Sequence, residues 1–181
     1  MKTTKWALVG VCVLLTSCST VSNLFTRNPS ATAVLAPTKG NSVSGTVNFT
    51  QKGAVVLVEA KITGLPANGT HGFHIHEKGN CSAADASSAG AHFNPSGDKH
   101  GGPVGAVRHG GDLGNLRADA NGYAHASIQV MGITLGTDAN SIIGRAVIVH
   151  GGPDDLKSQP AGNSGPRVAC GLISKNPDKF F

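Results

Sequence analysis

The sequence predicts an all-β domain, a sandwich or closed barrel with two long functional loops. Residues 56–62 and 124–130 alternate apolar and polar side chains with a period of two, which is typical of strands with one buried face. No segment of ten or more residues shows a helical period of 3.6. The 25 glycines and the low charged fraction of 14% also suit a turn-rich β domain.

The first 17 residues are expected to be an export signal rather than part of the domain. Lys2 and Lys5 precede the apolar run WALVGVCVLL, whose ten residues are too few to span a bilayer. The following LTSC resembles the bacterial lipobox, which predicts that Cys18 is the lipidated first residue of the mature protein. An ordinary cleaved signal with an incidental cysteine is the alternative.

Residues 18–41 are predicted to form a lipid-anchored flexible tether, because they contain Pro29, Pro37 and many small polar residues without periodicity. The domain would then span residues 42–181. Ser19 after the cysteine resembles lipoproteins sorted to an outer membrane, so we expect an exported protein of the periplasm or cell envelope that meets the membrane only through its anchor.

The charge of the mature chain argues against nucleic acid as a partner. Removing residues 1–17 takes two of the 15 basic residues and none of the 10 acidic ones, so the mature net charge is +3. That charge is small and dispersed, whereas nucleic-acid-binding domains concentrate basic residues.

Further elements follow from short patterns. RAVIVH at 145–150 is predicted to be a strand that ends in a histidine, and Asn68-Gly69 and Asn121-Gly122 predict tight hairpin turns. The segments 77–108 and 151–167 are rich in Gly, Ser, Asp and Pro. They are predicted to be the two long loops that carry the function.

Two of the four cysteines belong to the mature domain. Cys12 leaves with the signal and Cys18 is predicted to be lipidated, so Cys81 and Cys170 remain as an even pair. Disulfides persist in exported proteins, which predicts that these two pair. Two free buried thiols are the alternative.

All eight histidines lie between His71 and His150. His74 and His76 are two apart, so on a strand their imidazoles project from one face. With Asp112 there are more candidate ligands than one tetrahedral site uses, which predicts two ions. A group of imidazoles alone suits Cu(II), and three imidazoles with one carboxylate suit structural zinc; Asp112, three residues after His109, belongs with the second set.

Six separated motifs carry a family resemblance. GFHIHEKGNC, HFNP, KHGGP, RHGGDLGN, GRAVIVH and GPRVACG resemble the copper-zinc superoxide dismutase family, in order, over residues 42–175. The spacing of Cys81 resembles the bacterial branch of the family, and LTSC resembles its lipoprotein type. The resemblance implies an eight-stranded Greek-key β-barrel and a pairing of Cys81 with Cys170.

The resemblance also implies residue roles. Copper would be held by His74, His76, His92 and His150, and zinc by His92, His100, His109 and Asp112, with His92 shared. Asp154 would hydrogen-bond a ligand of each ion from behind, and Arg167 would hold the substrate anion near copper. His71 and His125 match no ligand position; we interpret His71 as structural and His125 as solvated.

The implied reaction is the dismutation of two superoxide anions and two protons to O₂ and H₂O₂, as antioxidant defence, with one copper and one zinc per chain as cofactors. Catalysis would use Arg167 and a proton carried by His92, and Lys99 and Lys157 could add to the attraction of the anion. Pro166, unusual before this arginine, would either pre-set or mis-aim it.

The same motifs leave two rival functions. One is a non-catalytic periplasmic store or delivery protein for copper or zinc with the same fold, and the other is a surface lipoprotein that reuses the fold for adhesion. The sequence leaves open whether the chain is a monomer or a homodimer, because its exposed strand faces are not decisively apolar.

Overall fold

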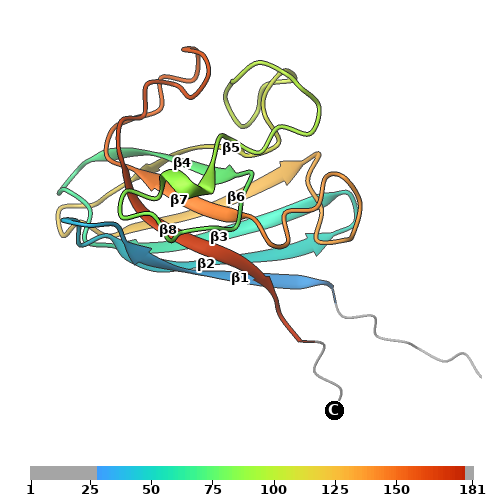
Figure 1. Cartoon of the computed structure of the whole chain (residues 1–181), viewed down its shortest axis with the longest axis horizontal. Helices are drawn as coiled ribbons and strands as arrows, with labels where there is room; N and C mark the ends of the chain where they lie inside the picture. Colours follow the sequence, from blue (N-terminus) through green and yellow to red (C-terminus); the bar gives the residue numbers. More distant parts are fainter. Residues whose placement is uncertain (1–27, 178–181) are drawn as a thin grey trace, which may run out of the picture.

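The computed structural model describes residues 28–177, which form eight β-strands and one short 3-10 helix, η1 (Ser87–Ala89) (Figure 1). The predicted all-β class is confirmed. No helix within these residues is long and apolar enough to cross a membrane. The strands are β1 (Ser30–Pro37), β2 (Ser44–Lys52), β3 (Val55–Thr63), β4 (Thr70–His76), β5 (Asp112–Arg117), β6 (Ala124–Met131), β7 (Ala146–His150) and β8 (Arg167–Lys175).

The strands pair antiparallel in the order β5-β4-β7-β8-β1-β2-β3-β6. The two end strands, β5 and β6, also contact each other, so the sheet curls into a nearly closed barrel. β3 neighbours β6, and β4 neighbours β7, although other elements separate them in the chain. These crossing connections are the predicted Greek-key feature.

The barrel core follows the predicted alternation. On β3 the side chains of Val56, Val58, Ala60 and Ile62 are fully buried, and Phe49 and Phe73 fill the interior from β2 and β4. β6 is less covered: Val130 is buried but Ile128 only partly. The reason is its place at the end of the sheet order, where one flank has no ladder partner.

Strand β1 corrects the predicted tether. Residues 30–37 form hydrogen-bonded ladders with both β2 and β8, and Ala31, Ala33 and Leu35 are buried in the core. The prediction of a tether up to residue 41 is therefore wrong for this strand, and the barrel begins near residue 30. The predicted signal, Cys18 and the tether as far as residue 27 lie outside the described residues.

The two Asn-Gly pairs form turns, but not hairpins. Asn68 and Gly122 adopt positive φ angles of 60° and 74°, as a tight turn requires. However, Asn68-Gly69 joins β3 to β4 and Asn121-Gly122 joins β5 to β6, and neither of these strand pairs is hydrogen-bonded. The hairpin prediction is wrong because these turns carry the chain across the barrel.

The two predicted long loops are confirmed. One runs from β4 to β5 and contains η1, and the other runs from β7 to β8; in Figure 1 both extend from the same side of the barrel. Cys81 in the first loop forms a disulfide with Cys170 on β8, with 5.8 Å between their Cα atoms. The predicted disulfide is thus confirmed, and it anchors the first loop to the strand that begins with Arg167.

Candidate metal centre

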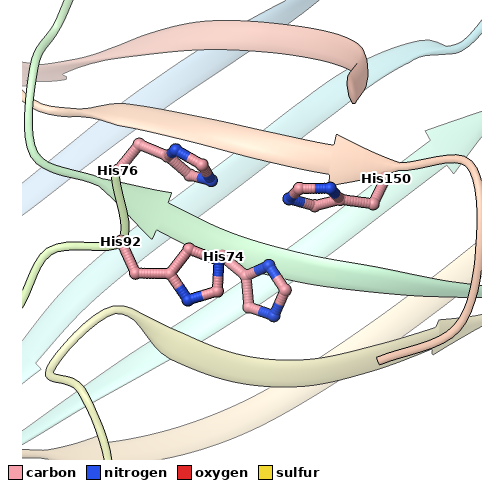
Figure 2. A group of neighbouring side chains, drawn as sticks. All are labelled: His74, His76, His92 and His150. Atoms are coloured by element: carbon pink, nitrogen blue, oxygen red, sulfur yellow. The ribbon is translucent and has the colours of Figure 1, made fainter. Parts of the chain in front are cut away.

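A first group of four histidines meets at the outer face of β4 and β7. His74 and His76 project from β4, His150 ends β7, and His92 lies on the first loop, where it forms an isolated bridge with His76. All four are buried, and one ring nitrogen of each lies within 4.8 Å of the others. Figure 2 shows the four rings facing a common space.

The ring nitrogens that face this space have no hydrogen-bond partner. They are Nδ1 of His74 and Nε2 of His76, His92 and His150, all buried. Such unpaired buried atoms are costly unless something binds them. The opposite nitrogens are occupied in three rings: His74 Nε2–H donates to Asp154 Oδ2 at 2.9 Å, His76 Nδ1–H to the Gly90 carbonyl at 2.9 Å, and His150 Nδ1–H to the Gly165 carbonyl at 3.1 Å. The group therefore presents four lone pairs to one point, which fits a metal ion.

Burial keeps these imidazoles neutral. Together with the neighbouring histidines, which contribute less, it lowers the pKa of His74 to about 4, that of His76 to about 2 and that of His150 to about 3. A metal ligand must be deprotonated, so at neutral pH no proton competes with the ion at these three rings.

A second group combines three histidines with one carboxylate. Nδ1 of His92, His100 and His109 lies 2.9, 3.0 and 3.3 Å from Asp112 Oδ1, and Nδ1 of His92 and His109 are 3.4 Å apart. A tetrahedron with metal–ligand bonds of about 2.0 to 2.1 Å has edges of about 3.3 Å. The set therefore has the size and composition of a closed tetrahedral zinc site.

Asp112 is held so that one oxygen faces this group. Its Oδ2 accepts hydrogen bonds from the backbone N–H groups of His109 at 2.8 Å and Gly101 at 3.0 Å. Burial disfavours the ionised carboxylate, but the hydrogen bonds and the His100 imidazole outweigh burial and hold the pKa of Asp112 below its usual range. The carboxylate is therefore charged and pre-oriented.

His92 belongs to both groups, with Nε2 facing the first and Nδ1 the second. Its segment is pinned between strands: Phe93 N–H donates to the Ile75 carbonyl and Gly111 N–H to the Phe93 carbonyl, both at 2.8 Å. Arg145 lies over the Phe93 ring at 3.6 Å from its centroid. The structure thus assembles all seven predicted ligands in the two predicted groups with the predicted shared histidine.

Asp154 connects the two groups from behind. Its Oδ2 accepts from His74 and its Oδ1 from His100 Nε2–H, each at 2.9 Å. The side chain of Asn115 fixes its backbone, accepting from Asp154 N–H at 2.8 Å and donating to its carbonyl at 2.9 Å. Sequence reasoning predicted Asp154 but missed Asn115, whose only signal was its place at the end of the RHGGDLGN motif.

Arg167 lies in the cleft that opens onto the first group. The cleft is lined by His76, His92 and His150, and the only arginine or lysine among its lining residues is Arg167. The guanidinium donates to the carbonyls of Ala86 and Gly90, both at 2.6 Å. Pro166 has therefore not turned Arg167 away from the histidines. Lys99 and Lys157, proposed as further attracting charges, are exposed and do not line this cleft.

The other two histidines lie outside both groups. His71 is 2% exposed, and its Nδ1–H donates to the His150 carbonyl at 3.0 Å, so it supports β7 from within. His125 is exposed on β6. Both fit the structural and solvated interpretations made from the sequence.

Comparison with known proteins agrees with this geometry. The sequence profile of the copper/zinc superoxide dismutase family matches residues 43–173. A protein of Paramecium bursaria Chlorella virus 1 named Cu-Zn superoxide dismutase is 42% identical over 177 residues, which cover 94% of this chain and 91% of the viral protein. A protein of Cordyceps militaris with the same name is 45% identical over 139 residues, covering 72% of this chain and 89% of the fungal one.

Proposed function

The chain belongs to the copper/zinc superoxide dismutase family and is a superoxide dismutase that uses copper and zinc, and from this premise we propose which residues perform the reaction and where in the cell it takes place. The first group, of imidazoles alone, holds copper, and the second, with its carboxylate, holds zinc. The observation that carries this assignment is the sharing of His92 between the two four-ligand groups.

When bound, copper supplies the one-electron oxidation and reduction of superoxide, and zinc supplies charge and fixes the loop. Two superoxide anions and two protons thereby give O₂ and H₂O₂. The chain holds its four copper-facing nitrogens ready: Asp154 and the carbonyls of Gly90 and Gly165 keep the protons on the far side of three rings. His92 Nε2 faces the cleft, and in a state in which it does not bind copper it would hold a proton and return it to the substrate.

Arg167 binds the anion beside the copper histidines. Its two hydrogen bonds to the loop carbonyls fix the guanidinium, and one of those carbonyls, of Gly90, also accepts from His76. The shared carbonyl therefore fixes the position of the Arg167 guanidinium relative to His76, a proposed copper ligand. A bound anion would lie between Arg167 and the histidines, and this arrangement favours an enzyme over a store or delivery protein, which has no need of an anion site.

Replacing Arg167 with alanine is expected to lower the second-order rate constant for superoxide by about ten-fold or more, within the range of electrostatic focusing. Copper content should not change, because arginine is not a ligand. Stopped-flow kinetics at increasing salt would show a falling wild-type rate and a flatter dependence for the variant. Arg167→Lys should recover part of the rate, since it keeps the charge but loses the planar fork.

The matched control for this prediction is Lys61→Ala, which removes the positive charge of an exposed side chain on β3 and should leave the rate unchanged. Full activity of Arg167→Ala with the wild-type salt slope would contradict the role and assign the attraction to another cation such as Lys157.

We place the enzyme in the cell envelope of a bacterium, tethered through a lipid on Cys18, as antioxidant defence. What supports this is the short apolar run followed by LTSC and the disulfide between Cys81 and Cys170, a bond that persists in oxidising compartments. Light scattering of the purified domain would decide between the monomer and the homodimer, which the sequence leaves open.

Trp6, the one tryptophan of the chain, reports removal of the signal. Protein purified from its native membrane should therefore show tyrosine but no tryptophan fluorescence, and mass spectrometry should find a lipidated N-terminal Cys18. The Cys18→Ser variant should lose the lipid and leave the membrane fraction. Tryptophan emission from the membrane-derived protein would mean that the signal is retained and would overturn the anchor.

A further inference from the structure

The loop between β7 and β8 touches both metal groups. Near its start Asp154 contacts His74 and His100, and at its end the Gly165 carbonyl accepts a hydrogen bond from His150. Between these points Pro160 and Ala161 line the cleft that holds Arg167. A contact that fixes the middle of this loop therefore also fixes the wall of the cleft in which the anion binds.

Gln159 attaches the middle of the loop to the backbone of His100. Its Oε1 accepts from His100 N–H at 2.8 Å, and its Nε2 donates to the His100 carbonyl at 3.0 Å. A second Nε2 hydrogen bond, to the Lys157 carbonyl at 3.0 Å, fixes the carboxamide within its own loop. The carboxamide thus pairs with both polar groups of one residue, as a neighbouring strand would.

His100 is consequently held by one loop at two places. Asp154 holds its side chain through Nε2, and Gln159 holds its backbone, while Nδ1 remains directed at the zinc group. The side chains of Asp154 and His100 are tightly packed against this loop. Gly162, at a φ of 65°, lies so close to them that a Cβ would collide with both. A shift of His100 must therefore be passed to Gln159 and to the adjoining cleft wall, Pro160 and Ala161.

We propose that Gln159 is a positioning residue that latches the 151–166 loop to His100, so that zinc in the second group and an anion in the copper cleft strengthen each other's binding. The inference rests on the proposed assignment of zinc to the group that contains His100. Zinc fixes His100, the latch fixes the cleft wall, and the anion gains a preformed site. Because coupling between two binding sites is reciprocal, the anion must raise zinc affinity by the same factor.

The test uses azide as a small-anion probe on copper-loaded protein, with and without zinc. In the wild type, zinc should raise azide affinity by about five-fold, and azide should raise zinc affinity equally, measured by chelator competition. Gln159→Ala should bring both factors close to one and lower zinc affinity by about ten-fold, as loss of a partner behind a ligand does. Gln159→Glu keeps the acceptor for His100 N–H but lacks the donor. It should therefore also lower the coupling factors and the zinc affinity.

Asn163→Gly is the matched control. Asn163 lies in the same loop, but its carboxamide bonds only to Asp155 Oδ2 at 3.1 Å and Ser158 Oγ at 2.9 Å, and glycine tolerates its φ of 53°. Its coupling factor should equal that of the wild type, and circular dichroism would verify that every variant is folded.

The outcomes separate the latch from the zinc assignment. If Gln159→Ala is less stable to heat but keeps the wild-type coupling factor, or if the wild-type factor is one, the latch is overturned and the zinc assignment stands. If wild-type protein with intact His100, His109 and Asp112 binds no zinc, the assignment fails and the latch fails with it.

Discussion

Replacing His150 with alanine should abolish copper-dependent superoxide turnover and leave a folded, zinc-binding barrel. Nε2 of His150 has no protein partner, so the substitution removes a metal ligand and only one protein hydrogen bond, from Nδ1–H to Gly165. Loss of a partner behind a ligand can lower activity by about 100-fold, and loss of the ligand itself should lower it at least as much. Elemental analysis and a superoxide consumption assay on the same preparation would measure both quantities.

Zinc content is the internal control for this substitution, because His150 contributes no atom to the second group. His125→Ala is the matched histidine control, since His125 is exposed on β6, and it should keep both metals and full turnover. A His150→Ala protein that retains one copper and its turnover would show that the first group does not hold the catalytic metal.

The three buried histidines of the first group should cost the metal-free protein about 4 kcal/mol of unfolding free energy between pH 7.5 and 5.5. Burial lowers the pKa of His74, His76 and His150 to about 4, 2 and 3, whereas in the unfolded chain each returns to about 6.5. Below pH 6.5 the unfolded state binds more protons, so stability falls as pH falls, by about 1.4 kcal/mol per histidine per pH unit. The melting temperature should drop by about 8 to 16 °C.

His100 works in the opposite sense. Burial alone would lower the pKa of His100, but the carboxylates of Asp154 and Asp112 outweigh burial and raise it. His100 therefore stabilises the folded state as pH falls, and it offsets a part of the stability lost through the other three histidines. His76→Gln, which cannot titrate, should flatten the pH dependence by about one third of the three-histidine effect. A melting temperature that is equal at both pH values would show that the three imidazoles are not buried neutral.

The sequence by itself indicated the candidate ligands and the strands seen as β3, β4, β6 and β7. The strict alternation of β3 and the two-residue spacing of His74 and His76 depend only on the strand period, so they could be predicted without knowing what packs against them. Ligand chemistry separated a group of imidazoles from a group that contains Asp112, and the six motifs, through the family that they resemble, assigned each histidine to its group. The even pair of cysteines likewise led to the disulfide.

Only the tertiary structure decided what depends on contacts between distant segments. β1 has three alanines beside Thr32 and Val34, so its apolar alternation is weak, and it becomes a strand because β2 and β8 both pair with it. The Asn-Gly turns fix a local reversal but not which strands then pair. Asn115 and Gln159 act through carboxamides on the backbones of Asp154 and His100, 39 and 59 residues away. A side chain that bonds to backbone leaves no pattern in the sequence, because any residue offers the same N–H and carbonyl, and only the folded barrel brings the two together.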